Sequence, residues 1–125
     1  MAGKIIADTL ETGAGADIAT SYVVNGSAKS TVVYDQTVPS ITGSLNISSL
    51  TDVSTGRATL DFTNNKSALD YSAVNGVGLK LAGYSGRLGE PNPFSTSQYE
   101  HYTFNHAGTG ADYTASSVVT FGDLA

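Results

Sequence analysis

The stretch LNISSLTDVSTGRATLDFT, from Leu45 to Thr63, has the pattern of two β-strands joined by a short turn. Its second half alternates apolar with polar positions, which is the period of two typical of a strand with one buried face. The apolar positions there are Ala58, Leu60 and Phe62. Residues 51–56 between the halves include the Asp, Ser and Gly that favour turns. The stretch therefore predicts an antiparallel hairpin.

Similar short segments recur along the chain. Gly, β-branched residues and Ser/Thr come too often for a helical period to persist over three or four turns. The sequence therefore predicts an all-β fold, a single antiparallel β-sandwich with jelly-roll-like connections. In the strand that leads into the hairpin, Ile41, Leu45 and Ile47 are expected on one face. The expected strands are residues 4–10, 21–24, 30–34, 41–50, 57–62, 71–81, 99–105 and 113–121.

Composition limits the size and the partners of the protein. A chain of 125 residues fits one domain, and 40% hydrophobic residues are enough for one core. The net charge is −5, and the six basic residues are scattered, so no basic stripe for nucleic acid is expected. Cysteine is absent, which excludes a disulfide framework and a thiolate metal site.

The chain divides into two expected parts, an N-terminal arm with a first strand (1–21) and a sandwich domain (22–125). Asp8 and Glu11 interrupt the apolar run of the arm, so neither a signal peptide nor a membrane span is expected. We therefore expect the protein to be made in the cytoplasm. Within the sandwich, residues 83–98 combine Gly, Pro and clustered Ser/Thr. This segment is expected to be an exposed loop that offers Tyr84 and Phe94 for contact.

Three motifs occur in the order of a known family: YVVNGSAK at 22–29, the hairpin at 45–63, and SVVTFGDLA at 117–125. With them, the chain resembles small β-rich virion proteins of tailed bacteriophages, of the tail-fibre or virion structural type. In that family a Gly-Ser-Ala-Lys element precedes a strand, an Asn-(Val/Ile)-Ser-Ser hairpin follows, and the chain may close on Phe-Gly-Asp. Ser30 and Thr31 stand here where members commonly have Ala-Trp.

The resemblance implies a non-enzymatic component of a virion, assembled as a homotrimer and attached to other capsid or tail proteins, without a cofactor. Capsid and tail positions both stay open. We expect apolar strand faces to form the seam of the trimer. Segment 1–21 is expected to reach a neighbouring protein, with Ile5, Ile6 and Leu10 as its anchors.

The segment YEHYTFNH at 99–106 is the best candidate for a ligand or partner site. On a strand, Tyr99 and His101 share one face, while Tyr102 and His106 lie on the other, so the two histidines do not converge on a metal. An alternative function is a carbohydrate-binding module for host recognition, with Tyr84, Phe94, Tyr99 and Tyr102 as contacts and His101 nearby. A glycan hydrolase is the third hypothesis and requires a pair of carboxylates across the sugar bond.

Overall fold

The computed structural model describes residues 7–11, 13–77, 88–93 and 95–125. In this part of the chain nearly all regular structure is β, which confirms the all-β prediction, and one short helix is present. The elements are β1 (Thr9–Glu11), β2 (Asp17–Ala19), α1 (Thr20–Gly26), β3 (Ser30–Asp35), β4 (Ser40–Leu45), β5 (Ile47–Ser54), β6 (Arg57–Phe62), β7 (Ser72–Val77), β8 (Leu88–Pro93), β9 (Gln98–Phe104) and β10 (Ser116–Phe121).

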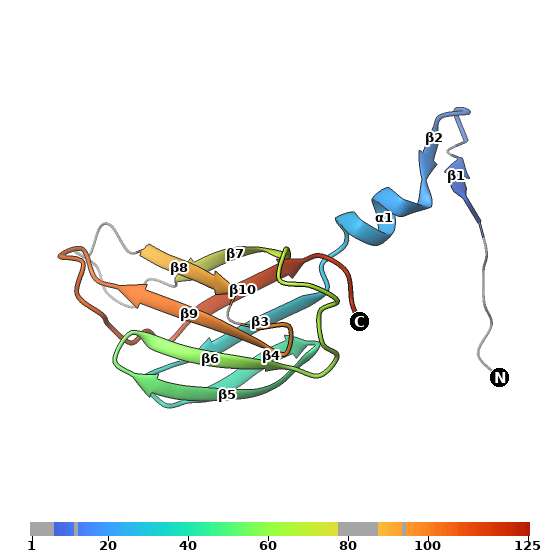
Figure 1. The fold of residues 1–125 in the computed structure, drawn as a ribbon. Coiled ribbons are helices and arrows are strands. Elements are labelled where there is room, and N and C mark those ends of the chain that lie inside the picture. The colour runs from blue at the N-terminus through green and yellow to red at the C-terminus, as the bar shows by residue number, and fades with distance from the viewer. Residues whose placement is uncertain (1–6, 12, 78–87, 94) are drawn as a thin grey trace.

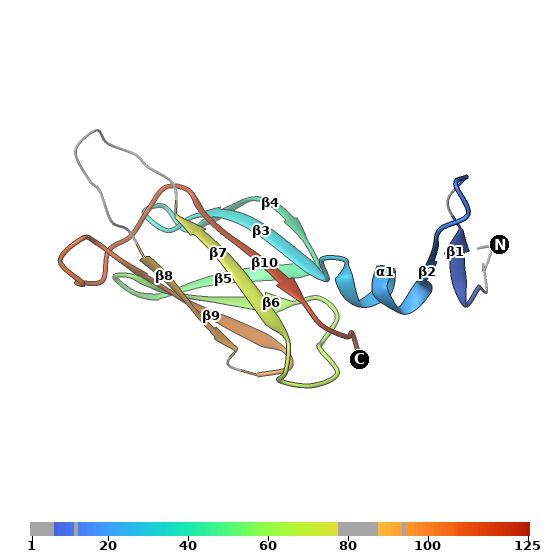
Figure 2. The ribbon, with the colours of Figure 1, turned by 90° about the horizontal axis from the view of Figure 1, so that it is seen from above.

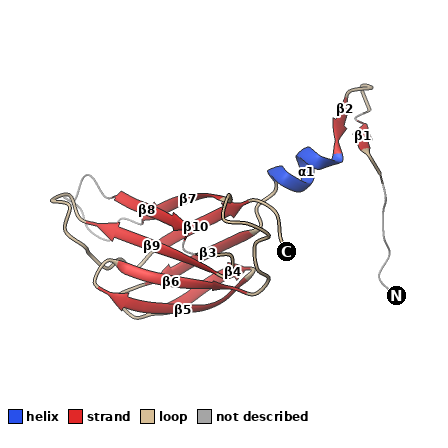
Figure 3. Cartoon of the chain, viewed as in Figure 1, coloured by secondary structure: helices blue, strands red, loops and turns tan. Residues whose placement is uncertain are grey.

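Two four-stranded antiparallel sheets face each other (Figures 1 and 3). The first sheet has the order β4-β3-β10-β7, and the second has the order β5-β6-β9-β8. Three pairs of consecutive strands, β3–β4, β5–β6 and β8–β9, are neighbours within one sheet. In a jelly roll most consecutive strands alternate between the sheets, so the expected jelly-roll connection is not confirmed. The coarser architecture is a two-layer antiparallel sandwich.

The core lies between the sheets and is supplied by alternate residues of the central strands. On β6 the burial pattern alternates strictly, so the buried side chains are those expected from the sequence, Ala58, Leu60 and Phe62. The first sheet adds Val32, Tyr34 and Val118 from β3 and β10. Burial of these side chains contributes on the order of 1.5–3 kcal/mol for each large apolar group, which makes the alternation the main determinant of the fold.

The hairpin predicted from 45–63 is present as β5 and β6, joined at Thr55 and Gly56. Gly56 has φ +75°, and a Cβ there would lie 2.5 Å from the carbonyl oxygen of Thr103. Its own carbonyl accepts a hydrogen bond of 2.8 Å from the N–H of Thr103. Only glycine fits this close approach of two backbones, so the turn also fixes the hairpin against β9.

The expected strand 41–50 is wrong as a single element, because the chain changes sheet in its middle. Asn46 has φ 57°, a left-handed conformation that asparagine tolerates better than most residues. Its side chain donates to the carbonyl of Asn64 at 3.0 Å and accepts from the Asn64 N–H at 2.7 Å. These bonds hold the corner between β4 and β5, and Leu45, which we expected beside Ile47 on one buried face, is exposed.

The expected strand 21–24 is wrong too, because these residues belong to α1. The β-branched and aromatic residues there favour strands, but that preference is realised only when a neighbouring strand pairs with them. A helix satisfies its backbone internally. Within the described part of the chain, strands β1 and β2 pair only with each other, and with α1 they form an arm that projects from one end of the sandwich (Figures 1 and 2).

The exposed loop expected at 83–98 is only partly tested. Leu88–Pro93 forms strand β8 at the edge of the second sheet, so that part of the prediction is wrong. Proline is compatible with an edge strand because one side of such a strand needs no partner. Residues 83–87 and Phe94, and with them Tyr84, lie outside the described residues, as do 78–81 of the expected strand 71–81.

Candidate functional site

Strand β9 carries most of the sequence that we singled out, and its two faces have different environments. The side chains of Tyr99, His101 and Thr103 are fully buried between the sheets. Those of Tyr102 and Phe104 lie half-buried on the opposite, outer face. The alternation predicted from the sequence is therefore confirmed along β9. His106 lies beyond the end of the strand in a turn and is exposed.

The inner face of β9 holds a buried polar network. The Nδ1 atom of His101 lies 2.7 Å from the hydroxyl oxygen of Tyr34, and the two rings meet edge to face. Tyr99 donates its hydroxyl to the side-chain oxygen of Asn75 at 2.7 Å. Burial lowers the pKa of His101 to about 4, so the ring is neutral at physiological pH. Tyr99 and His101 are thus core residues, and the contact with a ligand that we expected of them is not supported by their position.

The outer face of β9 holds a cluster around Glu100. Arg57 approaches Oε1 of Glu100 with Nε and Nη2 at 2.6 Å, while Asn92 and Tyr102 donate to Oε2 at 3.1 and 2.6 Å. Burial of this carboxylate opposes its ionisation, but the bonds from Tyr102, Arg57 and Asn92 outweigh that effect and lower its pKa. Both oxygens of Glu100 are thereby engaged. The cluster joins β6, β9 and the edge strand β8.

A second polar group continues along the same face. Asp61 accepts hydrogen bonds from Ser49 and, at 2.7 Å, from Gln98, which links β5, β6 and β9. On the other side of Glu100 the ring of Tyr102 stacks on that of Phe104, with centroids 6.5 Å apart and planes 8° apart. The guanidinium of Arg57 lies 5.6 Å from the centroid of the Tyr102 ring. The outer face of the second sheet is therefore charged, and the charges of Arg57, Asp61 and Glu100 are satisfied by partners within the sheet.

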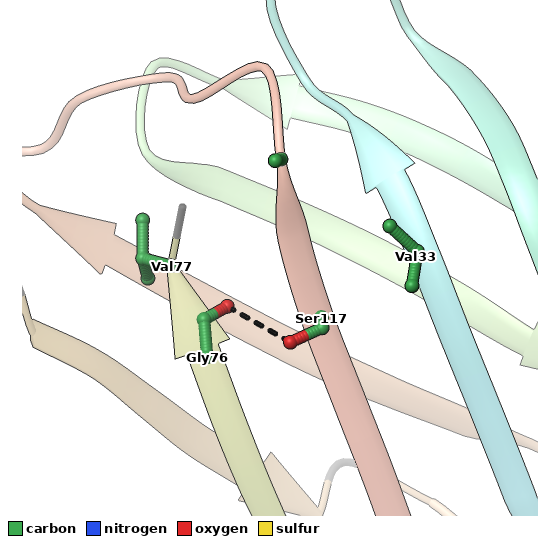
Figure 4. A pocket seen from close by; sticks show the side chains of 5 residues that line it. Val33, Gly76, Val77 and Ser117 are labelled. Atoms are coloured by element: carbon green, nitrogen blue, oxygen red, sulfur yellow. Dashed lines mark hydrogen bonds between the residues drawn. The ribbon is translucent and has the colours of Figure 1, made fainter. Parts of the chain in front are cut away.

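The outer face of the first sheet is different, because its central strands β3 and β10 carry Val, Thr and Ser there, and the acidic residue Asp35 lies only at the end of β3. The register places Val33 beside Ser117 and Thr31 beside Val119, and Ser117 beside Gly76. Val33 and Val74 are exposed, the latter to 60%. Close to Gly76 the surface is hollowed, and Figure 4 shows Val33, Val77 and Ser117 around this hollow. We call this surface the apolar face; its residues are Thr31, Val33, Leu45, Val74, Ser117 and Val119.

The apolar face was not predicted from the sequence, although a signal for it was present. Val32 and Val33 are adjacent on β3, and Val118 and Val119 are adjacent on β10. Because successive side chains of a strand point to opposite faces, an apolar pair puts one member on the inside and one on the outside. Two neighbouring strands with such pairs indicate a sheet that is apolar on both faces.

The N-terminal arm exposes apolar side chains as well. Leu10, expected as a docking anchor, is exposed on β1, and Ile18 is exposed opposite it on β2. On α1, Tyr22 is 72% exposed and Val24 is exposed beside it. The other expected anchors, Ile5 and Ile6, lie outside the described residues.

The described residues contain no group of three or more His, Cys, Asp or Glu side chains arranged to hold a metal ion. Their helix α1 has seven residues, and no helix among them has the length and apolarity to span a membrane. Comparisons of the chain with protein-family models, with curated proteins and with solved structures found no match.

Proposed function

We propose that the protein is a non-enzymatic structural subunit of a tailed-phage virion, located on the capsid or the tail, and that it acts by self-association and by docking on other virion proteins. The resemblance of its three ordered motifs to small phage virion proteins supports this proposal. The same resemblance makes a homotrimer, with apolar strand faces at its seam, the preferred assembly.

The observation that carries the proposal is the exposed N-terminal arm. Its two strands have three residues each, and an isolated two-stranded ribbon is at best marginally stable in water. The seven-residue helix that follows is also too short to be stable alone. Yet Leu10, Ile18 and Tyr22 are exposed in this arm, and β1 and β2 pair with each other and with no other described strand. An arm of this kind gains stability when another protein covers it, which is the role of a docking segment.

The second sheet supports a structural role rather than a catalytic one. A general acid or a nucleophile needs a carboxylate oxygen that can reach the substrate. Glu100 accepts hydrogen bonds at both oxygens, and Asp61 accepts from two neighbouring strands. Such bonds suit a brace that holds strands together.

Incorporation into particles tests the arm. We expect the double substitution Leu10→Glu and Ile18→Glu to reduce the amount of the protein in purified virions at least tenfold, because charges replace the apolar contacts of the arm. Leu69→Glu is the matched control, since Leu69 is exposed to a similar degree in a loop of the sandwich. Virions are purified after complementation with each variant and quantified by mass spectrometry. Normal incorporation of the arm variant would contradict the proposal.

A carbohydrate-binding module for host recognition is the second candidate function. The stacked rings of Tyr102 and Phe104 on an outer sheet face favour it, because sugars pack on such rings. Among the expected contacts that the structure describes, Tyr102 has a position that suits this role, whereas Tyr99 and His101 are buried in the core. A glycan array is the test: binding that is lost with Tyr102→Ala and Phe104→Ala would support the module, and an array without any binding would remove it.

A further inference from the structure

The ribbon of β1 and β2 in the arm has two chemically different faces. The register pairs Leu10 with Ile18, so these two apolar side chains share one face, and both are exposed. The next pair in the register is Glu11 with Asp17. Because successive side chains of a strand point to opposite faces, the two acidic side chains lie on the other face, where both are exposed. The ribbon is therefore amphipathic, with an apolar pair on one face and an acidic pair on the other.

The acidic pair is unfavourable in the isolated arm. Like charges that lie directly opposite each other destabilise an antiparallel pair, and Glu11 and Asp17 have this arrangement. Asp8 adds a third acidic residue, and residues 7–26 contain no lysine or arginine. Among the described residues, none of these three acids has an ion-pair partner. A partner that supplies cations would remove the repulsion, so docking would stabilise the ribbon on its acidic face as well as on its apolar face.

A second copy of this chain does not offer such cations from the part that the structure describes. Arg57 is paired there with Glu100. The ammonium group of Lys29 bonds the carbonyl of Val24, and the side chain of Lys66 is buried. The net charge of −5 also makes two copies repel each other. Nucleic acids and anionic membranes have the same sign of charge as the arm, so the occupant that these charges favour is a different, basic protein.

We propose that the arm docks in a groove of a different virion protein, whose apolar floor receives Leu10 and Ile18 and whose lysine or arginine side chains meet Glu11 and Asp17. This inference rests on the proposed function, since it names the chemistry of the partner on which the arm docks. Figures 1 and 2 show the ribbon away from both sheets, where such a groove can enclose it. The two faces also fix its orientation, because a ribbon turned over would press two carboxylates onto the apolar floor.

Binding of the full-length protein to particles produced without it tests the charged part of this contact. Sedimentation of the particles measures the dissociation constant. The constant of the wild type should rise roughly tenfold between about 50 and 300 mM sodium chloride, because salt screens the charges. Glu11→Lys combined with Asp17→Lys should weaken binding roughly tenfold at the lower salt concentration. Asp52→Lys combined with Asp70→Lys is the matched control and should bind as the wild type does, since both acids are exposed on the sandwich and the net charge changes equally.

The single substitution Glu11→Lys separates docking from the stability of the ribbon. It places opposite charges across the pair, which should stabilise the free arm. It should nevertheless weaken binding, because the introduced cation faces the basic side chains of the partner. Tighter binding than that of the wild type would mean that the acidic pair only destabilises the ribbon, and the inference would be wrong. If circular dichroism shows that a lysine variant is unfolded, Glu11→Gln combined with Asp17→Asn replaces it and should lose the dependence on salt.

Other occupants of the arm give different results. Binding that requires added magnesium and is lost with a chelator would show that a metal ion meets the acids, which would overturn the inference. A fall in the oligomeric mass of the free protein on charge reversal would place a second copy on the arm and would overturn it too.

The same measurements separate this inference from the proposed function. Binding that neither salt nor charge reversal changes, with the Leu10/Ile18 variant still excluded from virions, would reject the basic groove and leave the proposed function intact. A wild type that neither binds the particles nor occurs in virions would overturn both.

Discussion

The two faces of strand β9 bury a carboxylic acid and an imidazole base, and these two residues are consecutive in the sequence. Glu100, on the outer face, is only 3% exposed, and His101, on the inner face, is fully buried. Both have a lowered pKa, but the consequence differs because one is an acid and the other a base. Glu100 stays charged since three side chains donate to it, whereas His101 stays neutral since burial is the only cause of its shift.

The difference shows how this small sandwich tolerates ionisable groups. A buried charge is stable where donors surround it, and a buried base is stable where it can lose its proton. For both residues, the free energy of unfolding falls as the pH falls. The two windows begin at different pH values, however, because the pKa values of the unfolded chain are 6.5 for His101 and 4.5 for Glu100.

Acidification should produce the largest effect, and it acts first through His101. Between pH 6.5 and about 4 the unfolded chain binds a proton at this ring and the folded protein does not. The free energy of unfolding should therefore fall by about 3 kcal/mol across this window. Urea denaturation at several pH values measures it. His101→Gln should abolish most of the slope, while His106→Gln, the matched control on an exposed turn, should keep it.

Glu100→Leu tests the outer face. The substitution removes the acceptor for Arg57, Asn92 and Tyr102. It should lower the free energy of unfolding by about 2 kcal/mol. The loss is smaller than for a fully buried ion pair because the side chain of Arg57 is 40% exposed. The backbone amides of the β8–β9 pair should also exchange faster with deuterium. Asp52→Leu, on the exposed end of β5, should change stability by no more than about 0.5 kcal/mol. Equal losses in the two variants would mean that the cluster does not brace β8.

A feature of this fold could be predicted from the sequence when the residues that determine it are neighbours in the chain. The alternation on β6 and β9 and the turn at Gly56 follow from the sequence because a strand with one buried face needs a period of two. Helix α1 was not predicted because its residues favour strands. They form a helix because no neighbouring strand pairs with them, which the local sequence does not reveal. Strand β8 was missed because Gly and Pro indicate a loop, although an edge strand admits them.

The candidate site depends even more on partners that are remote in the sequence. The histidine of β9 was recognised, but its burial against Tyr34 depends on how the two sheets face each other. Two partners of Glu100 are distant from it in the sequence, Arg57 by 43 positions and Asn92 by 8 positions. Pairing of this kind is set by strand order, which local patterns do not specify.

Tyr34→Phe tests the inner face of β9. It removes the hydroxyl that meets Nδ1 of His101 and leaves that nitrogen unsatisfied in the core. A loss of about 1.5 kcal/mol is expected at pH 7.5, where the ring is neutral. Chemical denaturation measures the loss, and Tyr22→Phe, on an exposed tyrosine, serves as the control. An unchanged stability would show that this hydrogen bond has no net value in the core.

Lys66 is a buried cation, and its substitution is expected to change the free energy of unfolding least. Its side chain is buried, and its Nζ has no hydrogen-bond partner among the described residues. The ammonium group lies 5.0 Å from the ring centroid of Phe62 and 5.5 Å from that of Tyr71, contacts that offset only part of the cost of burial. Burial, with a smaller effect from Lys29, lowers the pKa of Lys66 to about 8.

Lys66→Met should therefore raise the free energy of unfolding by about 1 kcal/mol at pH 7, because methionine fills a similar volume without a charge. Between pH 8 and 10.5 the unfolded chain holds a proton at Lys66 that the folded protein has lost, so the wild type gains stability there and the advantage of methionine should shrink. Lys66→Ala leaves a cavity and should destabilise at every pH. A loss of stability in Lys66→Met as large as that in Lys66→Ala would mean that the surroundings of the ammonium group compensate its charge. Lys66 would then resemble Glu100, whose carboxylate has hydrogen-bond donors, and would not be an uncompensated buried charge.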